Sequence, residues 1–244
     1  MNLKRAYYDR ISPSRILNTI LYTNVILFVI SLIYSGRSMH TGFNPFQALS
    51  PSTDILIFLG ASGKIPIQAY HAWESLITAN WLHGSLLHIV FNMLALKTVA
   101  PLVMAEYGAF RMFTIYTLSG ASGFLLSVLG NVPLTIGASS GLCGLIGALL
   151  YFGRSRGGPR GQQVYQQTSG WIFSLILIGF LLPNINNWGH AGGLAGGIAT
   201  GWILGYDDRR PENRLDRALA VFLMIFTAVL LAWPVIQGFF LIYF

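Results

Sequence analysis

Long apolar segments recur along the chain and are separated by short polar or charged stretches. An α-helix needs about 20 mostly apolar residues to cross the hydrocarbon core of a bilayer. Seven segments reach or approach that length, although the fourth and the fifth are short: 16–34, 82–104, 112–130, 139–152, 171–182, 188–206 and 218–244. The pattern therefore predicts an all-α polytopic membrane protein with seven transmembrane helices in one membrane domain.

The composition agrees with this pattern. Of the 244 residues, 54% are apolar and 9% are charged, whereas roughly 25% of an average soluble domain is charged. So few charges argue against a soluble enzyme. The single cysteine, Cys143, excludes an internal disulfide and a cysteine-rich zinc site. The net charge of +7 is spread over the loops between apolar segments, so we expect the lipid bilayer, and no nucleic acid, as a partner.

The lysines and arginines predict the orientation, because cytoplasmic loops of membrane proteins carry an excess of them. Twelve of the fifteen fall on one side of the seven spans: Lys4, Arg5, Arg10, Arg15, Arg111, Arg154, Arg156, Arg160, Arg209, Arg210, Arg214 and Arg217. Only Arg37 and Lys64 fall on the other side, and Lys97 lies within a span. The N-terminus is therefore expected in the cytoplasm. The expected parts are a cytoplasmic tail at 1–15, a membrane core at 16–206, a cytoplasmic loop at 207–217 and an additional helix at 218–244.

Three of the predicted spans carry polar residues close to their outer ends. In the second span, His88 and Asn92 would lie about 9 and 15 Å from the start, at about 1.5 Å per residue. The fourth span begins at Ser139, and His190 is near the start of the sixth. Polar groups in hydrocarbon are costly and usually functional. The topology thus predicts that Ser139, His190, His88 and Asn92 share one layer near the outer face.

Glycines recur at helical spacing in two of these spans. The sixth span has five glycines at intervals of four residues, and the fourth span has a similar stripe: Gly189, Gly193, Gly197, Gly201 and Gly205; Gly137, Gly141, Gly144 and Gly147. Stripes of small residues allow two transmembrane helices to approach closely. If the two stripes face each other, the side chains of Ser139 and His190 come within reach of one another.

These residue types are suited to nucleophilic catalysis. A serine hydroxyl becomes a good nucleophile when a histidine accepts its proton, as His190 could do for Ser139. His88, the amide of Asn92 and the backbone N–H of Ser139 could stabilise an oxyanion. Since Gly137 and Ala138 precede a helix start, unpaired N–H groups are expected there. No Asp or Glu lies in the core of a span, so we expect a Ser-His dyad without a metal or other cofactor.

The motifs around these residues resemble those of the rhomboid family of intramembrane serine proteases. The segment GASSGLCGLIGA at 137–148 is similar to the family's G-x-S-G motif. The segment WGHAGG at 188–193 resembles its sixth-helix histidine motif, and His88-x3-Asn92 resembles its H-x-x-x-N signature. The resemblance covers about 59–206 and implies a six-helix bundle, here with one extra C-terminal helix, the six-plus-one arrangement.

The resemblance also implies a function and a set of site residues. It implies an endopeptidase that cuts single-span membrane proteins near the outer end of their helices. Ser139 would be the nucleophile and His190 the general base, while His88 and Asn92 would assist the oxyanion. A further group of residues would support the site: Gly137, Gly141, Gly189, Gly193 and Cys143. The expected location is the inner membrane of a bacterium, as a multi-pass protein.

The sequence departs from the family pattern at three places. Ser140 stands where the family usually has glycine, so Ser140 is an alternative nucleophile; we favour Ser139 because it fits G-x-S. Cys143 stands where an aromatic residue often supports the histidine ring. The outer loop has Trp73-Glu74 where the family has a Trp-Arg pair. These departures leave both residues of the predicted dyad in place.

Two other functions fit parts of the pattern. An inactive rhomboid-like protein could bind membrane helices as a quality-control factor, but such a protein would be expected to have lost the serine or the histidine. A small transporter could use the histidines and Asn92 as a polar pathway. That pathway would continue into the cytoplasmic halves of the spans, which contain mostly Gly, Ala and Leu. The protease is therefore the favoured interpretation.

Overall fold

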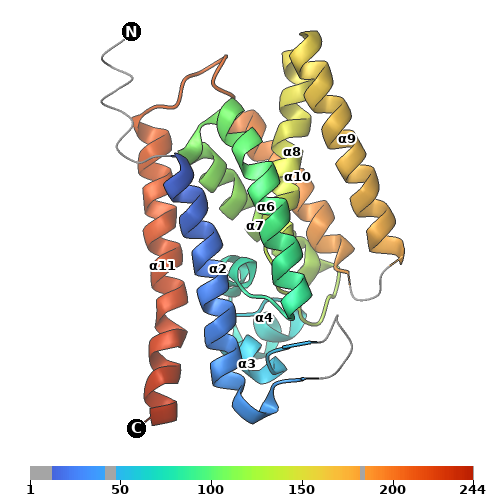
Figure 1. The fold of residues 1–244 in the computed structure, drawn as a ribbon. Helices are drawn as coiled ribbons and strands as arrows, with labels where there is room; N and C mark the ends of the chain where they lie inside the picture. Colours follow the sequence, from blue (N-terminus) through green and yellow to red (C-terminus); the bar gives the residue numbers. More distant parts are fainter. Residues whose placement is uncertain (1–12, 42–47, 182–184, 244) are drawn as a thin grey trace.

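The chain forms an all-helical bundle (Figure 1). This computed structural model describes residues 13–41, 48–181 and 185–243, so most of the predicted tail and Phe244 lie outside the described residues. Within these ranges the long helices are α2 (Pro13–Ser35), α6 (Leu86–Tyr107), α7 (Ala109–Leu129), α8 (Ser139–Arg156), α9 (Gly158–Leu181), α10 (Asn187–Leu204) and α11 (Arg214–Tyr243). The shorter elements are η1 (Gly36–Ser38), α3 (Thr53–Phe58), α4 (Lys64–Tyr70), α5 (Ser75–Thr78) and η2 (Ala79–Trp81).

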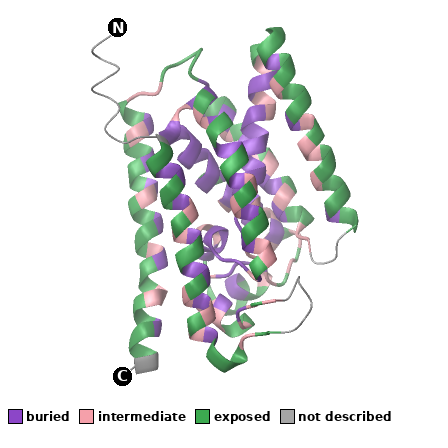
Figure 2. Cartoon of the chain, in the orientation of Figure 1, coloured by how far each residue is buried: buried purple, intermediate pink, exposed green. Residues whose placement is uncertain are grey.

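Among the described residues, five helices are long and apolar enough to cross a bilayer: Ser14–Ser38, Leu86–Tyr107, Ala109–Leu129, Gly158–Leu181 and Arg214–Leu241. Helices α8 and α10 have 18 residues each and are rich in glycine. Figure 2 shows that α9 and α11 expose most of their surface, much of it large and apolar. An exposed apolar surface of this kind fits a lipid environment, and the chain is an integral membrane protein.

Among the seven long helices only α8 begins at the residue that its apolar pattern predicts, and the differences at α6 and α9 have a clear structural cause. Helix α6 begins at Leu86 rather than at residue 82, because the Ser85 hydroxyl caps it by accepting the N–H of His88 at 3.3 Å. Helix α9 begins at Gly158 rather than at residue 171. Its polar first half is helical because it packs against α8, where a Cβ on Gly153 would lie 2.6 Å from the backbone nitrogen of Tyr165.

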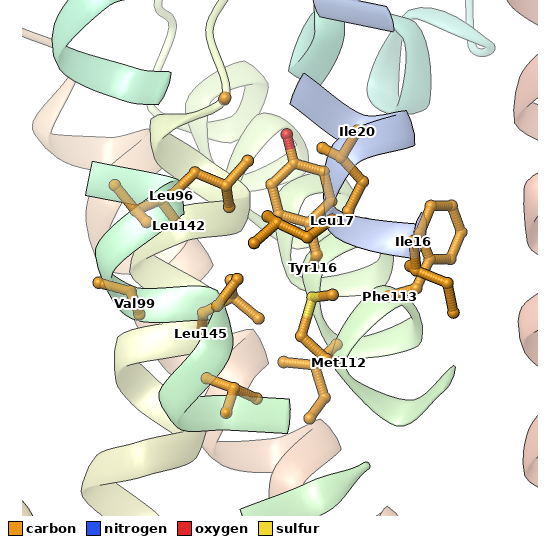
Figure 3. Close-up of a cluster of buried hydrophobic side chains, with 14 of the residues drawn as sticks. Ile16, Leu17, Ile20, Leu96, Val99, Met112, Phe113, Tyr116, Leu142 and Leu145 are labelled. Atoms are coloured by element: carbon orange, nitrogen blue, oxygen red, sulfur yellow. The ribbon is translucent and has the colours of Figure 1, made fainter. Parts of the chain in front are cut away.

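An apolar core joins α2 to the centre of the bundle. Figure 3 shows side chains from four helices in contact there, and all of the labelled ones are buried: Ile16, Leu17 and Ile20 of α2; Leu96 and Val99 of α6; Met112, Phe113 and Tyr116 of α7; Leu142 and Leu145 of α8. Burial of such side chains accounts for the packing of α2 against α6 and α7.

Helices α8 and α10 pack with their backbones in contact. A Cβ on Gly193 would overlap the backbone carbonyl of Ser140, and one on Gly197 would overlap that of Gly144. From the other helix, a Cβ on Gly147 would overlap the carbonyl of Leu194. The two glycine stripes therefore face each other, which brings the N-terminal ends of α8 and α10 together.

One end of the bundle is held by a buried arginine. The side chain of Arg111, at the start of α7, is fully buried and donates to Asp216 of α11 at 2.6 Å. It also donates to the backbone carbonyls of Gly205, Arg210 and Pro211 at 2.7–3.3 Å. Because burying a guanidinium is costly unless its donors are satisfied, this cluster fixes the segment 205–213 and the start of α11 against α7.

Candidate active site

Ser139 and His190 lie within hydrogen-bonding distance. The Nε2 atom of His190 is 3.1 Å from the Oγ atom of Ser139, although the residues are 51 positions apart. Ser139 is the first residue of α8 and His190 belongs to the first turn of α10. Both side chains are partly exposed. The close packing of the two glycine stripes thus brings a serine hydroxyl and an imidazole together at one end of two helices.

The backbone before Ser139 is held in a conformation that favours glycine. Gly137 has φ +126°, and its N–H donates to the carbonyl of Ala79 at 2.9 Å. A Cβ at this position would lie 2.7 Å from the Nε2 atom of His88. Glycine at 137 therefore allows both the turn into α8 and the close approach of the His88 ring.

The first turn of α8 has unpaired N–H groups beside Ser139. Ala138 provides no side-chain cap, but the Oδ1 atom of Asn80 accepts the N–H of Gly141 at 3.2 Å. The N–H of Leu142 donates to the carbonyl of Ala138 at 2.9 Å. In the part of the chain that the structure describes, the N–H groups of Ser139 and Ser140 have no acceptor. Such groups can stabilise a negative charge that develops at the serine.

His88 has a defined tautomer. The backbone N–H of Gly84 donates to the Nδ1 atom of His88 at 3.3 Å. A backbone N–H can only donate, so Nδ1 carries a lone pair and the proton of the neutral ring is on Nε2. Nε2 is the atom that approaches Gly137. His88 therefore presents an N–H donor on the side of the ring that is close to the start of α8.

Two other predicted residues form no hydrogen bond with the Ser139–His190 pair within the described ranges. The amide nitrogen of Asn92 donates to the carbonyl of His88 at 2.8 Å, which uses one of its two N–H donors. Cys143 is buried in α8, and no hydrogen bond joins its thiol to His190 among the described residues. Asn92 therefore keeps one free donor and one acceptor, and the supporting role expected of the buried Cys143 stays a prediction.

The supporting glycines act through packing. A Cβ on Gly141 would lie 2.7 Å from the carbonyl oxygen of Tyr116, and one on Gly189 would lie 2.9 Å from the Oγ atom of Ser140. Gly193 contacts the backbone of Ser140, as described above. These positions bring α7, α8 and α10 into backbone contact around the first turn of α8.

The structure distinguishes Ser140 from Ser139. Ser140 is 3% exposed, and its side chain lies between α7 and α10, 2.9 Å from the positions of a Cβ on Gly123 and on Gly189. Ser139, in contrast, is partly exposed and faces His190. The geometry thus favours Ser139 over Ser140 as the side chain that a substrate can reach.

The His190 ring has no second polar partner in the described ranges. Its Nδ1 atom is buried and makes no hydrogen bond to a described residue.

His83, which the apolar pattern includes in the second span, lies before α6 and is fully buried. The ring centroids of His83 and His88 are 5.0 Å apart. His83 therefore packs behind His88 and not against the Ser139–His190 pair.

Three residues beside the site do not belong to the motifs identified from the sequence. Asn80 caps α8 from another element, Gly84 sets the tautomer of His88, and Asn186 caps α10 by accepting the N–H of Gly189 at 3.0 Å. An asparagine directly before a helix is a recognised capping signal, so Asn186 could have been found from the sequence. Asn80 and Gly84 act across the fold, and no local pattern indicates them.

Comparison with known proteins agrees with this geometry. Residues 70–207, more than half of the chain, match the Rhomboid domain. The chain belongs to the rhomboid family. This rhomboid is 30% identical over 223 residues to RHOMBOID-like protein 5 of Arabidopsis thaliana, covering 81% of this chain and 70% of that protein. The family resemblance expected from the three motifs is confirmed.

Other relatives of this rhomboid differ in length and in activity. It is 34% identical over 185 residues to Rhomboid protease GluP of Bacillus subtilis (strain 168), covering 74% of this chain but only 35% of that protein. It is also 30% identical over 164 residues to Inactive RHOMBOID-like protein 8 of Arabidopsis thaliana. The family is generally one of intramembrane serine proteases, and it includes a relative named inactive.

Proposed function

We propose that this rhomboid is an intramembrane serine endopeptidase in which Ser139 is the nucleophile and His190 the general base. The observation that carries the proposal is the 3.1 Å contact between His190 Nε2 and Ser139 Oγ, in a chain whose relatives include a rhomboid protease. The two side chains are partly exposed, as attack on a substrate requires.

The geometry supports a two-step acyl transfer. The Oγ atom of Ser139 attacks the carbonyl carbon of the scissile bond while its proton passes to Nε2 of His190. The amine product leaves with that proton. A water molecule, deprotonated by the same Nε2 atom, then hydrolyses the acyl ester, releasing the acid product and returning the proton to Ser139. The residues of the pair are thus restored after each cycle.

Three donors are available for the oxyanion. The backbone N–H of Ser139 and the Nε2–H of His88 lie at the start of α8, and the free amide donor of Asn92 lies one turn after His88. Removing one donor of this kind costs about 10²–10³ in kcat in a well-studied serine protease. Because His88 offers an N–H donor at the start of α8 and Asn92 offers one a turn further along α6, we assign both residues to oxyanion stabilisation, as their motif implies.

The proposed topology follows from the charges and the helices together. The seven long helices would each cross the membrane, six of them forming the protease core and α11 the additional helix. The end of the bundle with Arg111, Arg156 and Arg209 would face the cytoplasm together with the N-terminus. The dyad would then lie near the outer face. The named relatives come from a bacterium and from a plant, so the bacterial inner membrane stays a prediction.

The proposed substrates are single-span membrane proteins cut near the outer ends of their helices. The peptide bonds of an intact helix are hydrogen-bonded and shielded by side chains, so the segment must unwind before Ser139 can attack. Helix-breaking residues such as glycine and proline near the cut would lower the free energy of unwinding. No cofactor takes part in this scheme.

Labelling with a fluorophosphonate probe tests the proposal, because the probe reacts with an activated serine. Detergent-purified wild type should be labelled, and Ser140→Ala should be labelled at a similar rate. Ser139→Ala and His190→Ala should lose labelling while keeping the wild-type melting temperature. If only Ser140→Ala lost labelling, Ser140 and not Ser139 would be the nucleophile.

A helix-binding function without catalysis is the second candidate, since one relative is named inactive. Absence of labelling in folded wild type would overturn the protease and favour this alternative. The same samples can then be tested for cross-linking to a single-span membrane protein, which the alternative predicts and which does not require Ser139.

A further inference from the structure

Asn186 connects the two segments that carry the proposed dyad. Its Nδ2 atom donates to the Oγ1 atom of Thr135 at 2.7 Å and to the Oγ atom of Ser127 at 2.7 Å. Its Oδ1 atom accepts the N–H of Gly189 at 3.0 Å. A primary amide has two N–H donors and one oxygen, so all three groups of this side chain are used. Asn186 thus joins α10, the end of α7 and the segment before α8.

The orientation of the amide follows from its partners. The N–H of Gly189 can only donate, so the atom that faces it must be the amide oxygen. The nitrogen then faces the two hydroxyl groups. The Ser127 hydroxyl is buried and donates its own proton to the carbonyl of Gly123 at 2.8 Å, which leaves its lone pairs for Asn186. The donors and acceptors of Asn186 and Ser127 are therefore mutually consistent.

The two linked residues have matching places in the sequence. Thr135 is four residues before Ser139, and Asn186 is four residues before His190. The backbone carbonyl of Asn186 accepts the N–H of His190 at 3.1 Å, so the turn that carries the base starts from this residue. Thr135 is held on its other side by backbone hydrogen bonds to Ser62, at 2.7 and 3.1 Å. The hydrogen bond from Asn186 to Thr135 therefore joins the two segments that lead into Ser139 and His190.

From this geometry we infer that Asn186, together with Thr135, is a positioning residue that sets the distance between Ser139 and His190. The inference rests on the proposed function. Catalytic groups must be held within roughly 0.5 Å of their productive positions by a supporting set of hydrogen bonds. The glycine stripes bring α8 and α10 together, but stripes of small residues do not by themselves fix how far one helix has slid along the other. The amide of Asn186 supplies that constraint beside the dyad.

Two substitutions separate this role from helix capping. Asn186→Ser keeps a short oxygen that can accept the N–H of Gly189 and cap α10, but it is too short to donate to Ser127 and Thr135. Thr135→Val removes the hydroxyl from the other partner at nearly constant volume and leaves Asn186 intact. Thr114→Val is the matched control, because Thr114 is also a buried threonine, and its hydroxyl bonds only to the carbonyl of Phe110 among the described residues, at 3.1 Å.

The readouts are the fluorophosphonate labelling rate and the kcat and KM for a designed single-span substrate in proteoliposomes. We expect Asn186→Ser and Thr135→Val each to lower kcat and the labelling rate about tenfold to a hundredfold, the range that a misplaced catalytic group can produce. KM and the melting temperature should change little. The double variant should be no worse than the more affected single variant, because both substitutions remove the same Asn186–Thr135 hydrogen bond. Thr114→Val should react like wild type.

The possible outcomes separate this inference from the proposed function. If wild type is labelled and both single variants react at the wild-type rate, Asn186 is only a helix cap and the inference fails alone. Additive losses in the double variant would also overturn it, because the two residues would then act independently. If folded wild type is neither labelled nor active, the proposed function itself fails.

Discussion

A Cβ on Gly137 would lie 2.7 Å from the Nε2 atom of His88, closer than side-chain atoms pack. Gly137 also has a positive φ of +126°. Because of the positive φ, any side chain at 137 would strain the turn into α8. Because of the close approach, it would also displace the imidazole of His88. The approach of His88 to the start of α8 therefore depends on glycine at this position.

Replacing Gly137 by alanine should thus reduce reactivity as well as stability. We expect Gly137→Ala to lose about 1–3 kcal/mol of stability from backbone strain and to react with the fluorophosphonate probe at least tenfold more slowly. Gly157→Ala is the matched control, because Gly157 also has a positive φ, of +66°, but nothing lies within 4 Å of its Cβ position. It should be destabilised without slower labelling. Equal labelling of both variants would contradict the role of this contact.

The glycine stripe between α8 and α10 gives a second prediction. A Cβ on Gly197 would overlap the backbone of Gly144, whereas a Cβ on Gly170 of α9 would meet nothing within 4 Å. Gly197→Ala should cost about 1–3 kcal/mol by overpacking. Gly170→Ala should be neutral or stabilise by up to about 1 kcal/mol, because alanine favours helix. Thermal unfolding in detergent measures both, and a Gly197→Ala protein as stable as wild type would contradict the close backbone contact.

The closeness of Ser139 and His190 can be predicted from the sequence because the signals for it are local. Each of Ser139 and His190 stands at the start of a glycine-rich apolar segment, and polar residues near the ends of such segments are unusual. The regular spacing of the glycines then indicates which faces of α8 and α10 pack together. The all-helical membrane fold and the proximity of these two side chains therefore follow from periodicity, charge and spacing, whereas their catalytic roles stay a prediction.

The remaining parts of the site depend on contacts between segments far apart in the chain. Asn80 acts through its bond to Gly141, and Gly84 acts through its N–H, which has no side-chain signal at all. The first half of α9 is polar and lies outside the apolar segment 171–182, but it is helical because Gly153 of α8 allows close packing. The commitment of one Asn92 donor to the carbonyl of His88 is likewise visible only in three dimensions.

The ion pair between Arg111 and Asp216 gives a third prediction. Both side chains are buried, and the Nη2–Oδ2 distance is 2.6 Å. Asp216→Asn should cost about 3–5 kcal/mol, because it leaves the buried guanidinium without its nearest and only buried carboxylate among the described residues, the other being the half-exposed Asp207 at 3.7 Å. The control is Asp208→Asn, which breaks the exposed pair with Arg156 and should cost at most about 1 kcal/mol. Equal unfolding free energies for the two variants would show that the buried pair does not hold α11 to α7.

Glu212 gives a prediction about pH. Its Oε1 atom accepts the N–H groups of Phe110 and Arg111 at 2.9 and 3.1 Å, outside the membrane-spanning helices. Burial raises the pKa of this carboxyl above its usual value, although both backbone N–H groups and the nearby Arg217 and Arg111 act to lower it. Because the folded pKa is the higher one, the folded state binds the proton more tightly. The stability that this proton provides is complete below the unfolded pKa and is lost as the pH rises through the folded pKa.

Glu212→Gln should therefore be more stable than wild type near neutral pH. Glutamine keeps an oxygen for the two N–H groups but cannot ionise, so it imitates the protonated carboxyl. The difference in unfolding free energy should shrink as the pH falls and vanish below about pH 4, near the usual carboxyl pKa. Glu74→Gln, at an exposed glutamate, controls for the loss of one negative charge. Denaturation between pH 4 and 8 measures how the difference in unfolding free energy depends on pH. If wild type instead gained stability over Glu212→Gln as the pH rose, folding would favour the ionised carboxylate and the prediction would be wrong.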